Sequence, residues 1–416
     1  MRRFIAAIIV GVVATALICV LHASGVLLRV EMAFSEMVSP YGSATRLVSD
    51  KWQYFFVTLL AFGVAYVTVA NRRRARVYGI AVALILELVS LSWVFSLYKI
   101  FFQPFPSVAA VVVAFAGGKI AGIFVGRSRR STTARRAFAG RLNPEQIARV
   151  GSGEIVFNGE AKRYESTVLV CDIANKYELA DDADPARYAE LTTRFMTRAS
   201  ALLLEAGAYI QSSDGEGIVA IFGFPEFFSD HAERAVRAGF DLFRTFTDLR
   251  EADISESNAK LDVHVGISSG SMIAAPVGEA GRTELLTAGE PVELSRRFCV
   301  ANRFYGSHVL VGPRTFELAN EAVIARPIDF LSGVNAQERH EIYEPLALTA
   351  GAPEDLITRR DFFWNGVVFY RERRWGEAYT EFQKARLPGD APDAPLELYL
   401  RRLEPLALHL TDLPND

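Results

Sequence analysis

The feature that most constrains this chain is a series of long apolar runs in its first third. A helix needs about 20 apolar residues to cross the core of a bilayer. Four runs have this character: Phe4 to Leu28, Trp52 to Ala70, Val77 to Tyr98 and Phe105 to Gly126. A secretory signal peptide is the alternative for the first run, but no clear small-residue cleavage site follows it and more apolar runs do. We therefore predict a helical transmembrane bundle of about four spans over residues 1–126.

Basic residues indicate how these spans are oriented. Arginines occur at positions 2, 3, 72–74, 76, 127, 129 and 130, all of which fall on one side of the membrane if four helices cross it. The positive-inside rule puts that side in the cytosol. We expect a multi-pass protein of the inner (plasma) membrane with both termini cytosolic. The segment from Arg29 to Lys51 is too short for a sensory domain, so an input signal would act on the bundle itself.

Two charges interrupt the spans, Glu87 in the third and Lys119 in the fourth. Intramembrane charges are costly unless they are paired, which suggests a contact between these two side chains, within one chain or between two. The alternative is that Lys119 extends to the interface and Glu87 is protonated.

Composition excludes several classes of function. A net charge of −3 gives no reason to expect a nucleic-acid partner. The cysteines, Cys19, Cys171 and Cys299, are too scattered for a disulfide framework or a zinc site. The six histidines form no HExxH or HxH arrangement, so the sequence predicts no histidine-bound metal.

The rest of the chain divides into three parts. Residues 127–160 are a basic connector in which Asn143 before Pro144 is a helix start signal. Residues 161–348 alternate strand and helix patterns, which indicates an α/β or α+β domain with one sheet. Residues 356–412 have the apolar spacing of a helical hairpin like one tetratricopeptide repeat, which would pack on the preceding domain because one repeat does not fold alone.

Carboxylates gather where two predicted strand segments end. Asp172 ends a buried strand, and Asp214 and Glu216 lie at the tip of a hairpin that runs from Ser212 to Gly223. Carboxylates in such places commonly hold Mg²⁺ against phosphates, because this ion prefers oxygen ligands. The alternative is that Asp214-Gly215 is only the residue pair that a tight turn favours.

The order of elements around these carboxylates resembles the class III adenylate/guanylate cyclases, in the membrane-anchored bacterial form, over about Glu165 to Leu346. The resemblance is carried by Val168 to Ile173, Ala220 to Pro225, Val265 to Gly270 and Gly289 to Arg297. It implies a ferredoxin-like α+β domain that converts a nucleoside triphosphate to a 3′,5′-cyclic nucleotide and pyrophosphate. It also implies two Mg²⁺ or Mn²⁺ ions held by two carboxylates, and a dimer, formed with itself or with another cyclase chain.

The resemblance assigns the metal positions one by one. Asp172 falls on the first metal position. Glu216 falls on the second, where the family has Asp, and its side chain is one methylene longer. Asp214 falls at an apolar position of the pattern and would replace Glu216 only if the turn is rebuilt.

The remaining site positions depart further from the family. Ser212 stands where adenylate cyclases have Lys, and Leu286 where they have Asp or Thr, so the hydrogen bonds that read adenine are lost. Glu293 replaces the Asn that orients the ribose and adds a negative charge.

Two basic positions remain for the nucleotide. Arg297 falls on the position of the transition-state Arg, with a solvated charge beside Arg296 as the alternative. Lys176, in the loop after Asp172, is a point charge that could attract a phosphate.

Three interpretations follow from these matches and departures. The chain is an active cyclase with a divergent base pocket, or a pseudo-cyclase that binds nucleotide or a partner and passes a conformational change to or from the membrane bundle. The third is a heterodimer in which this chain supplies Arg297 to a partner with a complete metal site.

Overall fold

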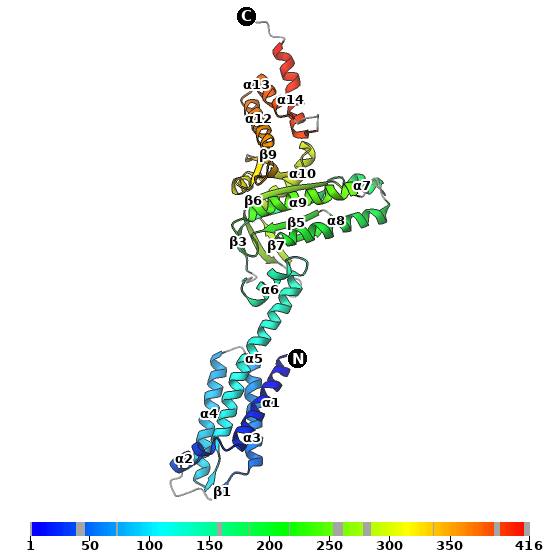
Figure 1. Cartoon of the computed structure of the whole chain (residues 1–416). Coiled ribbons are helices and arrows are strands. Elements are labelled where there is room, and N and C mark those ends of the chain that lie inside the picture. The colour runs from blue at the N-terminus through cyan, green and yellow to red at the C-terminus, as the bar shows by residue number, and fades with distance from the viewer. Residues whose placement is uncertain are drawn as a thin grey trace. The chain divides into compact units, whose positions relative to one another are not determined.

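A computed structural model describes residues 2–38, 46–71, 74–155, 160–182, 184–215, 217–252, 261–277, 284–335, 337–386 and 392–411 (Figure 1). The chain divides into two compact units, residues 1–134 and 135–416. Glu216, one of the predicted metal ligands, lies outside the described residues.

The first unit is a bundle of helices. In the described part of this unit, four helices are long and apolar enough to cross a membrane: α1 (Arg2–Ala23), α3 (Asp50–Ala70), α4 (Arg74–Ser96) and α5 (Pro104–Phe138). Their inward side chains form one apolar cluster that includes Ala14, Val57, Ala61 and Val111. Many large apolar side chains on the outside remain exposed, among them Phe4, Val12 and Leu59. Such all-round apolar helices are expected where the surroundings are lipid.

One end of the bundle is held by polar contacts. The ring of His22 on α1 lies 3.1 Å from the hydroxyl of Tyr54 and 3.0 Å from Oε1 of Gln103. Gln53 donates to the backbone oxygen of Gln103 at 2.6 Å. Between α1 and α3 the chain forms a further helix, α2 (Leu28–Val38), and the two-residue strand β1 (Arg46–Leu47), which pairs with β2 (Ile100–Phe101).

The ion pair predicted between Glu87 and Lys119 within one chain is wrong. Nζ of Lys119 lies 4.6 Å from the centre of the Tyr78 ring and 5.3 Å from that of Phe115. Glu87 is exposed on the outside of the bundle, and no ion pair of the described residues joins it to Lys119. The ammonium group of Lys119 is stabilised by aromatic faces instead. A contact between two chains stays a prediction.

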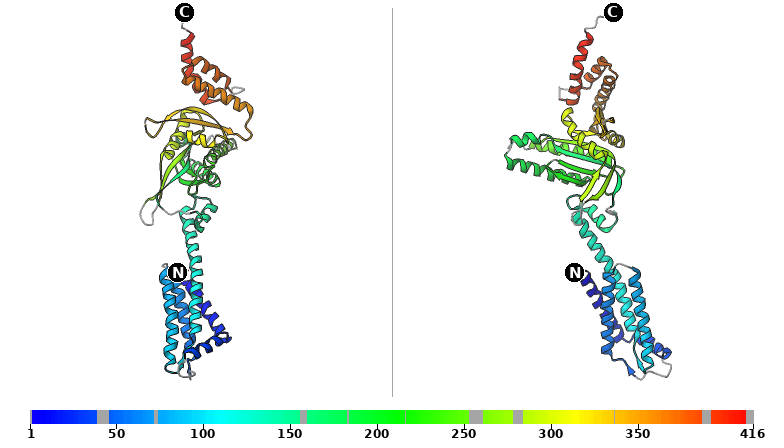
Figure 2. Two further views of the ribbon diagram at one scale, coloured as in Figure 1. Left: turned by 90° about the vertical axis from the view of Figure 1, so that its left-hand side faces the viewer. Right: turned by 180° about the vertical axis from the view of Figure 1, so that it is seen from behind.

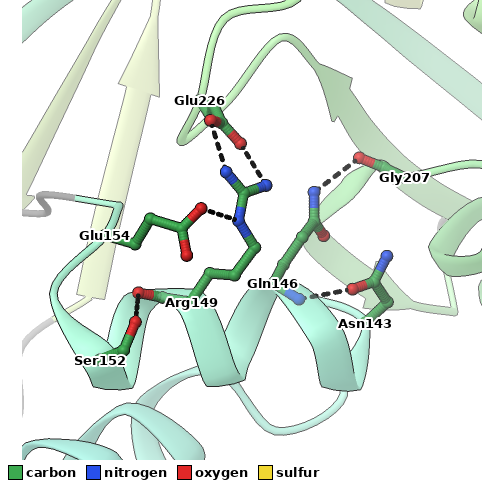
Figure 3. Close-up of polar contacts among 7 residues, drawn as sticks. All are labelled: Asn143, Gln146, Arg149, Ser152, Glu154, Gly207 and Glu226. Atoms are coloured by element: carbon green, nitrogen blue, oxygen red, sulfur yellow. Dashed lines mark hydrogen bonds and ion pairs between the residues drawn. The ribbon is translucent and has the colours of Figure 1, made fainter.

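The connector contains the expected helix, α6 (Pro144–Ser152), and Asn143 caps it by accepting from the backbone N–H of Gln146 at 2.8 Å (Figure 3). Arg149 on this helix donates through both terminal nitrogens to the carboxylate of Glu226, each at 2.8 Å. Because Glu226 belongs to the loop after strand β5 (Gly217–Phe222), this bidentate pair fastens the connector to the sheet domain.

Figure 2 shows the sheet of the second unit in two further views. The sheet has eight strands among the described residues, in the order β4-β5-β3-β6-β8-β10-β9, with β7 paired to β6. All neighbours are antiparallel except β6 and β8. The strands are β3 (Lys162–Ile173), β4 (Tyr209–Asp214), β5 (Gly217–Phe222), β6 (Val263–Val277), β7 (Glu284–Ala288), β8 (Val309–Val311), β9 (Val323–Ser332) and β10 (Arg339–Leu348). The mixed sheet with helices against it confirms the predicted fold class.

Helices cover the sheet on both faces. Leu169 and Cys171 of β3 point into a core that includes residues of α8 (Pro185–Glu205) and α9 (His231–Ala252). Val168 and Val170 point to the other face, where they meet the connector and α10 (Glu290–Tyr305). Successive side chains of β3 thus enter two different apolar clusters, which is the pattern of a strand buried on both faces of the sheet. Two short helices, α7 (Lys176–Asp182) and α11 (Pro313–Ala319), complete the domain.

Helix α10 packs directly on the backbone of β6. A Cβ atom at Gly266 would lie 2.1 Å from the backbone oxygen of Ser295 and 2.2 Å from the nitrogen of Cys299. Only glycine allows this approach, so Gly266 sets how deeply α10 lies on the sheet.

The C-terminal residues form three helices: α12 (Glu354–Arg371), α13 (Trp375–Lys384) and α14 (Ala394–Thr411). They share an apolar cluster with α10 and the outer strands, in which Phe363, Phe382 and Tyr399 meet Leu294 and Phe298. These C-terminal helices therefore pack on the preceding domain, as the sequence predicts for the helical hairpin of residues 356–412.

A buried ionic network joins the same two parts. Arg326 on β9 is only 7% exposed, and it donates to both carboxylate oxygens of Asp393 at 2.7 Å and to Glu344 at 2.8 Å. Its guanidinium carbon also lies 4.4 Å from the centre of the Phe363 ring. Asp393 accepts from the backbone N–H of Leu396 as well, so one carboxylate both caps α14 and neutralises the buried arginine.

We expect Asp393→Ala to destabilise residues 135–416 by about 3 kcal/mol, because it leaves a buried guanidinium partly unpaired and removes a helix cap. Urea unfolding would measure the change. The control is Glu317→Ala, which removes an exposed pair with Arg314 and should cost no more than about 0.5 kcal/mol. Equal losses of unfolding free energy in the two variants would contradict the proposed contribution of the buried network to stability.

Candidate active site

Asp172 lies next to the last residue of β3, beside the start of β5. Cys171 is paired with Ile218 across these strands, so the preceding residue of β5, Gly217, lies against Asp172. Gly217 has a φ of +129°, and a Cβ there would lie 2.6 Å from the backbone oxygen of Cys171. The hairpin can approach Asp172 this closely only because position 217 is glycine.

The carboxylate of Asp172 is already engaged inside the chain. Its Oδ1 accepts from the backbone N–H of Ile173 at 2.8 Å, and its Oδ2 accepts from Nζ of Lys176 at 3.0 Å. The side chains are 26% exposed for Asp172 and 14% for Lys176. This partial burial strengthens the pair relative to one on the open surface. Two residues that the sequence analysis assigned to metal and nucleotide thus bind each other.

The hairpin brings Asp214 to the same edge of the sheet. Asp214 is the last residue of β4, is exposed, and is paired with Gly217, which in turn lies against Asp172. Two strand spacings, about 10 Å, therefore separate the backbones of the two aspartates. Ser212 lies two residues earlier on β4, half-buried, and is paired with Val219.

Leu286 lies on β7, opposite Ala275 of β6, with half of its side chain exposed. Its neighbour Leu285 packs instead into the cluster beneath the connector. An exposed leucine here provides an apolar surface and no hydrogen bond.

Glu293 and Arg297 are neighbours on α10, one turn apart. Nε of Arg297 donates to Oε1 of Glu293 at 3.2 Å. One terminal nitrogen of Arg297 also donates to the backbone oxygens of Gly333 at 2.7 Å and Ser332 at 3.3 Å. Arg297 is thus bound to its own chain rather than freely solvated, and no hydrogen bond or ion pair of the described residues joins it to Asp172.

A group of side chains that the sequence analysis missed lies next to Asp172. His264 of β6 is directly opposite Asp172 in the strand register, and Asp262 and His308 lie close to it. Burial lowers the pKa of His264 to about 4, and the nearby His308 lowers the pKa of Asp262. No spacing motif reveals this group, because β6 and β8 are joined only by the sheet.

The two cysteines of this domain do not provide a nucleophile. Cys171 and Cys299 are both buried. Burial raises the pKa of the Cys299 thiol to about 12, and its Sγ donates to the backbone oxygen of His264 at 3.3 Å. Thiolate chemistry is excluded for such protonated, inaccessible groups.

Comparison with known proteins places this geometry in context. The chain matches no established protein-family profile. It is 27% identical over 191 residues to an uncharacterised protein of Mycobacterium tuberculosis, covering 46% of this chain and 32% of that protein. It is 21% identical over 202 residues to adenylate cyclase 1 of Rhizobium meliloti, covering 48% of this chain and 30% of the relative. The matched region thus spans about a third of the length of these curated relatives.

Among solved structures, the adenylyl cyclase CyaB from Pseudomonas aeruginosa superimposes with a TM-score of 0.42 and 22% identity, over 45% of this chain and 96% of that chain. The sheet domain is similar to class III adenylyl and guanylyl cyclase domains. Below, residues 161–348 are called the cyclase-like domain.

Four buried side chains inside this domain are joined by a chain of hydrogen bonds. Nδ1 of His231 and the hydroxyl of Thr167 are 2.6 Å apart, Thr167 is 2.7 Å from Ser269, and Ser269 is 2.9 Å from Thr315. His231 is 4% exposed. Burial lowers its pKa from the usual 6.5, with Glu165 and Asp230 opposing the shift and Arg314 adding to it.

Because the folded-state pKa of His231 is the lower one, the unfolded chain binds a proton first as the pH falls below about 6.5, and stability decreases. We expect His231→Gln to lower the slope of the unfolding free energy against pH in this range. The reduction is at most about 1.4 kcal/mol per pH unit, which corresponds to one proton. The measurement is urea unfolding of residues 135–416 between about pH 5 and 7.5. Parallel curves for the two proteins would show that His231 does not titrate in this range.

Proposed function

We propose that this chain is a membrane-anchored signalling protein whose cyclase-like domain converts a nucleoside triphosphate to a 3′,5′-cyclic nucleotide and pyrophosphate. The observation that carries the proposal is the position of Asp172, at the end of the central strand and against the hairpin tip that bears Asp214. Sequence similarity to an adenylate cyclase supports it. The four apolar helices support an inner (plasma) membrane location, with both termini cytosolic by the distribution of arginines.

The donor set at this edge fits Mg²⁺ or Mn²⁺, because both described acidic side chains, Asp172 and Asp214, offer carboxylate oxygens. When bound, the ion would activate the ribose 3′-hydroxyl and neutralise the triphosphate. Lys176 holds Oδ2 of Asp172 at 3.0 Å and must release it to admit an ion. A triphosphate provides the alternative partner, since phosphate oxygens attract the same ammonium group.

The residues at the base-binding positions of the proposed enzyme offer few hydrogen bonds to a nucleotide base. Ser212 offers one hydroxyl, and the half-exposed Leu286 offers only an apolar contact. Because specificity between purines depends on buried hydrogen bonds, we expect little discrimination among nucleoside triphosphates.

The proposed active form is a homodimer, in which Arg297 of one chain faces the carboxylates of the other; a second cyclase chain is the alternative partner. Support comes from exposed apolar side chains on β6 and β7, where Ile273 and Leu286 are 39% and 50% exposed. Apolar side chains grouped on neighbouring strands favour burial by a partner. Arg297 would have to leave the backbone oxygens of Ser332 and Gly333 to stabilise charge on the nucleotide.

A second function, that of a pseudo-cyclase, is favoured by two ion pairs within the chain. The ammonium group of Lys176 lies 3.0 Å from Oδ2 of Asp172, a carboxylate oxygen that a metal ion would need. In the same chain, Glu293 forms an ion pair with Arg297 and neutralises its charge. With these pairs intact the domain would bind a nucleotide or a partner chain and relay a change in the membrane bundle without turnover.

Turnover by the full chain in detergent, with ATP, GTP, CTP and UTP and with Mg²⁺ or Mn²⁺, separates the two functions. We expect cyclic product, and a loss of at least about 100-fold in Asp172→Ala, because an oxygen ligand of the transition state is removed. If a folded dimer forms no cyclic product with any of the nucleotides, the proposal of an enzyme is overturned and the pseudo-cyclase is the function that remains.

Glu293→Asn should raise kcat by about tenfold, equivalent to 1.4 kcal/mol, because it removes a negative charge near the triphosphate and releases Arg297. The matched control is Glu290→Gln, on the same helix and equally exposed at 49%. Equal rates for the two variants would show that Glu293 has no special electrostatic effect.

A further inference from the structure

Asp262, His264 and His308 form a compact group on two adjacent strands. His264 is the second residue of β6, and His308 immediately precedes β8. The backbone N–H of Val265 donates to the oxygen of His308 at 2.8 Å, which locks the two segments side by side. Each of the three side chains presents one ligand atom, and these atoms all lie within 4.8 Å of one another.

The group is held in place by contacts outside itself. Oδ1 of Asp262 accepts from the backbone N–H of Val263 at 3.0 Å, and the backbone N–H of Asp262 donates to the side chain of Asn175 at 3.1 Å. The ring of His308 lies against that of Phe243, with centroids 4.4 Å apart. Such supporting contacts orient ligands in metal sites.

One ligand atom is buried next to an acidic oxygen. Nδ1 of His308 is shielded from solvent. It lies 3.4 Å from Oδ1 of Asp262, with which it forms an ion pair longer than an ideal hydrogen bond. Two ligand atoms that face each other at this distance are placed to share one bound ion.

We propose that Asp262, His264 and His308 bind a transition-metal ion of the Zn²⁺ class. In a tetrahedral zinc site, bonds of about 2.0–2.1 Å place neighbouring ligand atoms about 3.3 Å apart, close to the separation of His308 and Asp262. Two imidazoles and one carboxylate favour Zn²⁺ over Mg²⁺, which prefers oxygen ligands. Three protein ligands leave a fourth position for water.

This site is separate from the carboxylates of the candidate active site but lies next to them, because His264 is opposite Asp172 in the register of β3 and β6. An ion there adds positive charge beside the Asp172–Lys176 pair. The inference does not depend on cyclase activity, since it rests only on the three side chains and their surroundings.

Titration of the full chain with Co²⁺ tests the proposal, using protein purified in detergent without a histidine tag. Bound Co²⁺ in a low-coordinate nitrogen and oxygen site gives visible d–d absorption. We expect one Co²⁺ per chain, displaced by Zn²⁺, and affinity reduced by at least about 100-fold in both His264→Gln and His308→Gln.

A control variant makes the outcome decisive. His340→Gln alters another group of possible ligands, formed with Glu290 and Glu338, and should bind Co²⁺ as the unmodified chain does. Thermal unfolding of each variant without metal checks that it is folded. Absence of absorption in the unmodified chain, equal binding by all variants, or loss of binding in the control variant overturns the proposal.

Discussion

Burial of β3 on both faces determines where polar chemistry can occur in the cyclase-like domain. Val168, Leu169 and Cys171 are almost completely inaccessible, so an ionised side chain along the middle of this strand would have no solvent and no room. Asp172 is the second-last residue of the strand, where its side chain is 26% exposed and lies beside the tip of the hairpin formed by β4 and β5. The candidate carboxylates therefore gather at one edge because the rest of the sheet excludes them.

Charge neutralisation within the chain occurs at two places in this domain. Lys176 binds Asp172, and Glu293 binds Arg297, each pair four residues apart. In the proposed enzyme a nucleotide and its metal ion would replace these partners, whereas in the proposed pseudo-cyclase the two pairs would stay intact. The two proposed functions therefore differ in what happens to these two contacts.

The C-terminal helices stabilise the helix that carries Arg297. Leu294 and Phe298 of α10 pack into the cluster formed with α12, α13 and α14, while Gly266 admits the helix backbone onto β6. Arg326 and Asp393 close the same interface with buried charges. Movement of the C-terminal helices would therefore move α10 with them. This gives the hairpin a physical role in setting the position of the candidate catalytic arginine.

The sequence by itself determined those features that depend on local pattern. Apolar runs long enough for a bilayer predicted the four helices, the cap at Asn143 predicted α6, and the apolar run before Asp172 predicted a buried strand. The spacing of four positions from Glu293 to Arg297 puts them on one helical face. Each of these follows from helix or strand periodicity, which neighbouring residues define without help from the rest of the fold.

Only the tertiary structure decided which distant residues meet. His264 and His308 come together with Asp262 because β6 and β8 pair in parallel, a register that no short motif encodes. Lys119 meets Tyr78 rather than Glu87 because helix packing sets the direction of each side chain. Arg326 finds Asp393 only when the C-terminal helices dock. Such contacts are set by the packing of whole elements, whose positions depend on the entire core rather than on local sequence.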